Sequence, residues 1–222
     1  MRAAIITASG GPEVLELQDL PSPEPGDWDL HVQVDASALN RADLLQRRGL
    51  YPAPHGAPAA VPGLEFAGRV IGRGRFVTRF ALGDRVMGIV GGGACADELI
   101  IHEREALAIP EGLSATDAAA IPEAFMTAFD AAVLQGGLTS GGWLAINAVG
   151  SGVGTAAVQI ARALGARSIG SSRTADKLVR AQALGLDVAV EGTSADLRRA
   201  AAEATGGGAD VAVDLLGGEG VD

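Results

Sequence analysis

The sequence has 222 residues, of which 48% are hydrophobic, and its formal net charge is −10. That length suits one large or two small domains with a buried core, and the acidic balance disfavours binding to nucleic-acid phosphates. Cys95 is the single cysteine, so no intramolecular disulfide can form and a cytoplasmic protein is expected. The sequence predicts neither a membrane span nor an N-terminal signal peptide, because no long apolar run occurs.

The first half of the sequence predicts short strands separated by glycine and proline turns. The proline-rich stretch at 21–29 marks a loop, since proline breaks regular structure. Apolar or alternating runs are typical of strands and cover residues 2–7, 14–20, 30–36, 64–74, 84–90 and 94–102. Many short strands with glycine turns favour a small, partly open β-barrel.

Helical sequence begins at about residue 114. Ser114 is a candidate N-cap with Asp117 three residues later, and Pro122 suits the first turn of a second helix that is expected to run to Gln135.

From Trp143 onward strands and helices alternate, which predicts a parallel, doubly wound sheet. The expected strands are 143–147, 167–172, 187–190 and 209–216, and the expected helices are 152–164, 175–184 and 195–204. In the usual strand order 3-2-1-4-5-6 the fourth strand would be a bare edge. We therefore expect an incomplete chain, or one that needs a partner.

The stretch NAVGSGVG at 147–154 joins a predicted strand to a predicted helix. Glycines at 152 and 154 let the backbone approach a pyrophosphate, and the helix N-terminus offers free N–H groups and a positive dipole end. Ser151 adds a hydroxyl donor. The alternative interpretation is a tight turn without a ligand.

The next predicted strand indicates which dinucleotide would bind. An NAD site favours an acid about 20 residues beyond the glycines, whereas here the strand ends in Ser172 and Arg173, and Lys177 follows. Hydroxyls and cations suit a 2′-phosphate, so NADPH is predicted. The alternative is that both cations are ordinary surface residues.

Four stretches carry a family resemblance: SALNRADLLQRRGLYP (37–52), GLEFAGRV (63–70), AAAIPEAFMTAFDA (118–131) and SGVGTAAVQIARALGA (151–166). On these, the chain resembles the zinc-free medium-chain dehydrogenases/reductases of the NADPH:quinone oxidoreductase family, and most of all the p53-inducible quinone oxidoreductase-like subgroup. The resemblance implies an α/β protein with a GroES-like β-barrel domain at 1–122. A C-terminally incomplete Rossmann domain with about four of six strands would follow at 123–222.

The same resemblance implies site residues. Tyr51 would lie beside the nicotinamide, and Asn40 and Thr127 would contact the nicotinamide side of the cofactor. Tyr51 is also the only tyrosine and stands in a Gly- and Pro-flanked loop, so it is the candidate catalytic proton donor. The alternatives are that it only orients the substrate ring, or that it packs on the barrel. The phosphate turn would be formed by Ser151, Gly152, Val153 and Gly154. A full-length homodimer is expected.

No metal is expected. Zinc-bearing relatives place a cysteine at the position of Asn40, a histidine at Leu64 and often a cysteine near Glu123, and their structural zinc lobe needs four cysteines. The three histidines lack ligand spacing, and Glu65 and Glu123 are expected to be hydrogen-bonded carboxylates.

These observations predict an oxidoreductase that transfers hydride from NADPH to a quinone, an activated alkene or an activated carbonyl, without zinc. The alternative is a truncated or non-catalytic NADPH-binding member of the family. A lens or RNA-binding role rests on family association alone, and the acidic charge opposes RNA.

Overall fold

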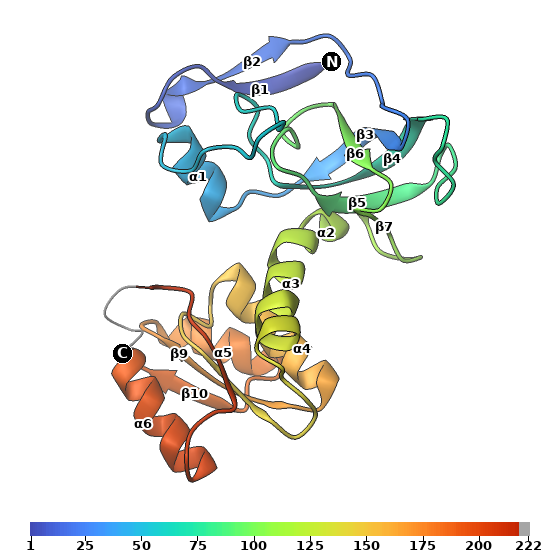
Figure 1. The fold of residues 1–222 in the computed structure, drawn as a ribbon. Helices are drawn as coiled ribbons and strands as arrows, with labels where there is room; N and C mark the ends of the chain where they lie inside the picture. Colours follow the sequence, from blue (N-terminus) through green and yellow to red (C-terminus); the bar gives the residue numbers. More distant parts are fainter. Residues whose placement is uncertain (218–222) are drawn as a thin grey trace. The chain divides into compact units, whose positions relative to one another are not determined.

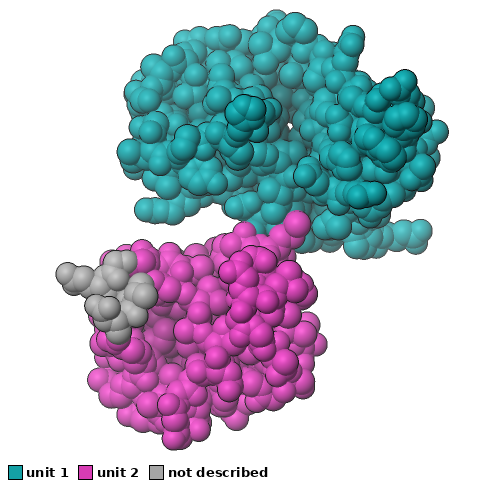
Figure 2. Space-filling model, viewed as in Figure 1, with its two compact units in different colours: residues 1–123 teal, residues 124–222 magenta. Residues whose placement is uncertain are grey.

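The computed structural model describes residues 1–217 and divides the chain into two compact units, residues 1–123 and residues 124–222 (Figure 2). The predicted domains were 1–122 and 123–222, and the last five residues of the second lie outside the described part. The two units are treated separately below.

Unit 1 contains a five-stranded antiparallel sheet in the order β6-β3-β4-β5-β7 (Figure 1). Its outer strands β6 and β7 do not pair with each other within the described residues, so the prediction of a partly open barrel is confirmed. The short strand β7 was not predicted. The strands are β3 (Asp29–Ser37), β4 (Glu65–Arg73), β5 (Arg85–Ile89), β6 (Glu98–His102) and β7 (Ala106–Ala108).

The core of unit 1 follows from alternation along these strands. Leu30 and Val32 on β3, and Phe66 on β4, are fully buried, because successive side chains of a strand point to opposite faces. Burying such a side chain contributes roughly 1.5–3 kcal/mol. The alternating pattern therefore fixes which sheet face encloses the core.

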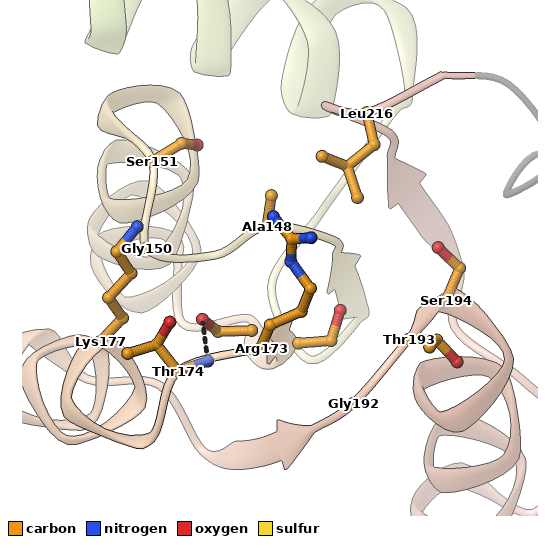
Figure 3. Close-up of a pocket in the computed structure, with 12 residues that line it drawn as sticks. Ala148, Gly150, Ser151, Arg173, Thr174, Lys177, Gly192, Thr193, Ser194 and Leu216 are labelled. Atoms are coloured by element: carbon orange, nitrogen blue, oxygen red, sulfur yellow. Dashed lines mark hydrogen bonds between the residues drawn. The ribbon is translucent and has the colours of Figure 1, made fainter.

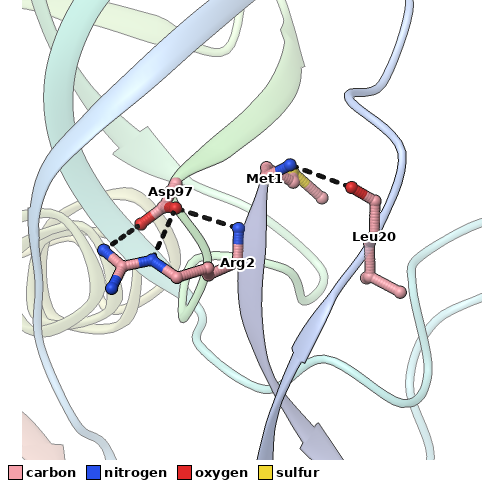
Figure 4. A network of polar contacts seen from close by, with 4 residues as sticks. All are labelled: Met1, Arg2, Leu20 and Asp97. Carbon is pink, nitrogen blue, oxygen red and sulfur yellow. Dashed lines mark hydrogen bonds and ion pairs between the residues drawn. The ribbon is translucent and has the colours of Figure 1, made fainter.

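A separate two-stranded antiparallel sheet pairs β1 (Arg2–Ile6) with β2 (Leu15–Asp19), and the 3-10 turn η1 (Pro12–Val14) lies between them. Polar contacts tie β1 to the segment before β6 (Figure 4). The backbone N–H and the guanidinium Nε of Arg2 both donate to Asp97 Oδ2, over 2.9 and 3.2 Å. These bonds fix the hairpin to the rest of unit 1.

Two short helices complete unit 1. The α1 helix (Arg41–Arg47) was not predicted, whereas α2 (Ala115–Ala119) begins after the predicted N-cap Ser114. The Ser114 hydroxyl accepts the Asp117 N–H over 3.1 Å, which satisfies one of the free donors at the helix start.

Unit 2 contains a four-stranded parallel sheet in the order β10-β9-β8-β11. Numbered within the unit, this is 3-2-1-4, so the predicted doubly wound arrangement is confirmed. Strand β11 is shorter than the predicted 209–216. The strands are β8 (Trp143–Ile146), β9 (Arg167–Ser172), β10 (Val188–Glu191) and β11 (Val211–Val213).

The predicted helix from Pro122 to Gln135 divides into two geometries. Residues up to Phe129 form α3 (Pro122–Phe129), and the next six form a π-helical segment, η2 (Asp130–Gln135). The N–H of Gly136 donates to the carbonyl of Ala131, five residues back, which is the widened π turn. Periodicity alone could not separate the two geometries.

Three α-helices follow the strands of unit 2: α4 (Gly152–Leu164), α5 (Ala175–Leu184) and α6 (Ser194–Thr205). The buried face of α4 carries small residues, and Ala157 and Ala161 are fully buried against Leu144 and Ile146 of β8. Small side chains let the helix approach the sheet closely.

Each unit holds one of the two tryptophans. Trp28 packs against Phe76 in unit 1, with ring centroids 5.2 Å apart, and the Arg167 guanidinium lies 4.1 Å from the Trp143 ring centre in unit 2. None of the helices within residues 1–217 has the length and apolarity needed to cross a membrane.

Candidate functional site

A pocket of about 380 Å³ opens where β8, β9 and β10 end at the same edge of the unit 2 sheet (Figure 3). The carboxyl edge of a parallel sheet, at the point where the strand order reverses, is the usual place for a ligand in this fold class. The lining residues are Ala148, Gly150, Ser151, Ser171, Ser172, Arg173, Thr174, Lys177, Gly192, Thr193, Ser194 and Leu216.

The first wall of the pocket is the turn between β8 and α4. The Ser151 hydroxyl caps α4 by accepting the Gly154 N–H over 3.1 Å, and its own O–H stays available as a donor. The N–H groups of Gly152 and Val153 find no acceptor within residues 1–217. Free donors at a helix N-terminus attract an anion such as a pyrophosphate.

The glycines of this turn serve different purposes. A Cβ on Gly154 would lie 2.7 Å from the Val149 carbonyl oxygen, and a Cβ on Gly150 would lie 2.7 Å from the Lys177 side chain. On Gly152 it would meet only the Ala124 Cβ, at 3.8 Å. Internal packing therefore requires glycine at 150 and 154, whereas position 152 is open.

Ala148 adopts a left-handed backbone conformation, with φ of 47°. It is the single non-glycine residue with positive φ among the residues that the structure describes, and it lines the pocket. That conformation costs an L-residue roughly 1–2 kcal/mol. Strain of this kind often accompanies a functional turn.

The second wall is formed at the end of β9 and the start of α5. Ser172 is buried and its hydroxyl accepts the Thr174 N–H over 3.2 Å, whereas Arg173 and Lys177 are exposed. Figure 3 shows the Arg173 side chain extending toward Ala148 and the Lys177 side chain extending toward Gly150. Two cations therefore converge on the pocket.

The third wall was not predicted from the sequence. It consists of Gly192, Thr193 and Ser194 after β10, together with Leu216 after β11. Thr193 and Asp196 form a capping box at the start of α6, and a Cβ on Gly192 would lie 2.4 Å from the Asp196 carboxylate. The signal in the sequence was the threonine-to-aspartate spacing directly after a strand.

In unit 1, polar side chains gather around the N-terminus of α1. Asn40 caps that helix, and its Nδ2 donates to Glu65 Oε1 over 2.7 Å. The other oxygen of Glu65 accepts the Glu123 N–H over 2.9 Å, and Glu65 is 2% exposed. Asp43 is also buried and accepts the N–H groups of Asn40 and Gly63.

Three carboxyl groups thus share one region, and they differ in their donors. Asp43 and Glu65 each accept two N–H bonds, whereas the Glu123 carboxyl receives none within residues 1–217. Burial, followed by repulsion from Glu65 and then Asp43, raises the pKa of Glu123 above its ordinary value. Glu123 therefore keeps its proton to a higher pH than an ordinary glutamate does.

Tyr51 lies in the irregular segment after α1 and is 39% exposed. Leu39, Leu44 and Leu50 nearby in the sequence are also exposed. An exposed phenol beside apolar side chains is available to a ligand.

The structure gathers Ser151, Ser172, Arg173 and Lys177 around one pocket. Gly152, Val153 and Gly154 form the first turn of α4 and are not among the lining residues of that pocket, and Val153 packs toward the unit 2 core. Thr127 is exposed on α3 in unit 2, and Asn40 and Tyr51 belong to unit 1.

The chain matches two family models. Residues 26–124 match the alcohol dehydrogenase GroES-like domain, and residues 152–222 match the zinc-binding dehydrogenase model. Among solved structures, the quinone oxidoreductase from Thermus thermophilus, described with its NADPH complex, is 35% identical with a TM-score of 0.81. The alignment covers 99% of this chain and 68% of that one. The chain belongs to the zinc-free quinone oxidoreductase family of medium-chain dehydrogenases/reductases.

Two further proteins are similar to this chain. An NAD-dependent alcohol dehydrogenase structure is 38% identical with a TM-score of 0.87, over 98% of this chain and 71% of that one. A Pseudomonas aeruginosa quinone oxidoreductase is 35% identical over 90% of this chain and 61% of the relative. The chain spans about 60% of the length of the curated relatives that it matches first. The two similar structures, one described as NAD-dependent and the other with NADPH, support a nicotinamide cofactor.

Zinc, which one family model names, does not fit the residues present. The two positions that the family resemblance equates with zinc ligands hold an amide, Asn40, and an alkyl chain, Leu64. No group of three or more His, Cys, Asp or Glu side chains in residues 1–217 has metal-binding geometry. Both Glu65 oxygens already accept N–H bonds, which agrees with the expected hydrogen-bonded carboxylate. The same expectation is wrong for Glu123, because its carboxyl accepts no hydrogen bond within residues 1–217 and only its backbone N–H is bonded.

We expect Glu123→Gln to change how stability depends on pH. A carboxyl whose folded pKa is raised binds more protons in the folded state, so wild-type stability falls as pH rises above the ordinary value of 4.5. We would measure the melting temperatures of both proteins at about pH 4.5 and about pH 8. The melting temperature of the variant, relative to that of the wild type, should be higher at about pH 8. Glu111→Gln, on an exposed turn, is the matched control, and an equal gain there would contradict the assignment.

We expect Ala148→Gly to stabilise unit 2 by about 1 kcal/mol, because glycine adopts positive φ without the steric cost of a Cβ. Ala163→Gly, at an exposed site in α4, should instead destabilise by about 0.5–1 kcal/mol. Urea unfolding followed by Trp143 fluorescence would measure both. Loss of stability in both variants would contradict the strain assignment.

Proposed function

We propose that this protein is an NADPH-dependent oxidoreductase that reduces a quinone or an activated alkene or carbonyl without zinc. The observation that carries the proposal is the unit 2 pocket, in which a helix N-terminus and two cations converge with no carboxylate among the lining residues. The alternative is a non-catalytic NADPH-binding member of the family.

NADPH is preferred over NADH because of the end of β9. NADH sites use a carboxylate to accept hydrogen bonds from the ribose 2′-hydroxyl, and a carboxylate repels a 2′-phosphate. Here Ser172, Arg173 and Lys177 occupy that region. A guanidinium and an ammonium attract the extra phosphate, and the hydroxyls add hydrogen bonds.

The pocket residues would hold the cofactor by its phosphates. The free N–H groups at the start of α4 and the Ser151 hydroxyl suit the pyrophosphate, and Arg173 and Lys177 suit the 2′-phosphate. Position 152 has room for close approach. By family resemblance, Asn40 and Thr127 would contact the nicotinamide side.

When bound, NADPH supplies a hydride from C4 of its nicotinamide. The protein must then provide a proton and orient the substrate oxygen. Tyr51, the only tyrosine in the sequence, is exposed and can donate its phenolic proton. An amide and a phenol activate a substrate oxygen only by hydrogen bonding, which suits quinones and enones that already accept hydride readily.

We further propose that the full-length protein is a cytoplasmic homodimer acting on a small-molecule substrate. The family resemblance supports the dimer, and a single cysteine agrees with a reducing compartment.

Cofactor choice tests the two cations. We expect Arg173→Ala combined with Lys177→Ala to weaken NADPH binding by about 10- to 100-fold, because charge-assisted bonds to the 2′-phosphate are lost. NADH binding should change far less. Arg180→Ala, an exposed cation on the same helix as Lys177, is the control. Equal loss for both cofactors would contradict the 2′-phosphate assignment.

Turnover tests the catalytic assignment. The wild-type chain is expected to oxidise NADPH with a small quinone, and Tyr51→Phe should lower kcat by about 100-fold while leaving NADPH affinity unchanged, because a general acid is removed. Stopped-flow absorbance of NADPH would measure this. NADPH binding without any quinone reduction by the wild type would favour the non-catalytic alternative instead.

A further inference from the structure

Two side chains join the carboxyl ends of β8 and β11. Asn147, directly after β8, is buried, and its Nδ2 donates to Asp214 Oδ1. Its Oδ1 accepts the Leu215 N–H over 2.6 Å. Both functional groups of the Asn147 amide are therefore committed to the segment after β11.

Asp214 in turn determines the conformation of that segment. Its Oδ1 also accepts the Leu216 N–H and its Oδ2 accepts the Gly217 N–H, each over 3.0 Å. The two side chains together accept three consecutive backbone N–H groups. Those groups are withdrawn from strand pairing, which explains why β11 ends at Val213 rather than at residue 216.

The pair joins the two chain segments that carry two walls of the unit 2 pocket, although neither Asn147 nor Asp214 lines that pocket itself. On one side Asn147 is followed at once by Ala148, Gly150 and Ser151, which line the pocket. On the other side the Asp214 segment carries Leu216, which also lines it and is 66% exposed. Figure 3 shows Leu216 on the opposite side of the pocket from Lys177.

Strain makes a rigid support necessary at this place. Ala148 has positive φ, and an unfavourable backbone conformation persists only where its surroundings fix it. The two bonds of the Asn147 side chain anchor the residue immediately before it. Loss of the pair would let the turn relax and the Leu216 wall move.

We propose that Asn147 and Asp214 are positioning residues of the cofactor pocket, which hold the phosphate turn and the Leu216 wall in register with each other. The proposal rests on the proposed function for the identity of the cofactor. Hydrogen bonds from Asn147 and from the Leu216 N–H lower the pKa of Asp214, so its carboxylate stays charged at neutral pH and the pair stays formed.

A matched pair of variants separates positioning from general stability. Asp210 links the same two strands at their amino ends, where its Oδ2 accepts the Trp143 N–H over 2.7 Å. Asp210→Ala and Asp214→Ala each remove one such link, but only Asp214 is bonded to the pocket segment. Binding of NADPH would be measured by its fluorescence, at a temperature where circular dichroism shows every variant folded.

We expect Asp214→Ala to weaken NADPH binding by about tenfold, as loss of a charged hydrogen bond predicts, and Asp210→Ala to change it less than twofold. Asn147→Asp should also weaken binding, because two carboxylates then face each other. Adding Asp214→Asn should restore part of the affinity, since an N–H···O bond can form again between the two side chains.

The outcomes are distinguishable. If the wild type binds NADPH and Asp214→Ala and Asn147→Asp bind it with the same affinity, the positioning role is overturned but the proposed function is not. Equal losses of affinity in Asp210→Ala and Asp214→Ala would have the same meaning. Absence of NADPH binding by the wild type would overturn the proposed function as well. Failure of the Asn147→Asp, Asp214→Asn double variant to regain affinity would also count against the pair.

Discussion

The parallel pairing of β8 on both of its edges is the constraint on which unit 2 depends. Strand β9 follows β8 in the chain and pairs on one side, and β11 pairs on the other. Because the connections to these two neighbouring strands run to opposite sides, a crevice opens at the carboxyl end of β8. The left-handed Ala148 turns the backbone into α4 at this point, so the start of that helix, where Ser151 is the N-cap, faces the crevice.

The sequence predicted those features of the fold that depend on residues close together in the chain, and missed those that depend on distant residues. The Ser114 cap and the alternation of strands and helices after Trp143 are local patterns, and the structure contains both. The early end of β11 was not predictable in the same way, because it depends on Asn147 and Asp214, which are far apart in the sequence. Thr193 at the pocket is different, because the expected strand order already placed β10 beside β9, and the Thr193 to Asp196 spacing after β10 was a local signal that the prediction did not use.

By family resemblance, Asn40 stands where zinc-bearing relatives place a cysteine, and in unit 1 this position is occupied by a hydrogen-bonded amide. Asn40 donates to Glu65, and Glu65 also accepts the Glu123 N–H, so one carboxylate joins the start of α1 to the start of α3. A buried carboxylate is tolerated because both oxygens have donors. The sequence predicted that Glu65 would be hydrogen-bonded, but not its partners, which are 25 and 58 positions away.

The placement of the two tryptophans has a practical consequence for spectroscopy. Trp28 stacks on an aromatic ring in unit 1, whereas Trp143 lies beneath a guanidinium in unit 2. The two indoles therefore have different electrostatic surroundings, which shift emission energies by different amounts. A chain in which either indole is replaced by phenylalanine becomes a single-chromophore reporter, so melting or ligand docking in one half can be followed optically without interference from the other.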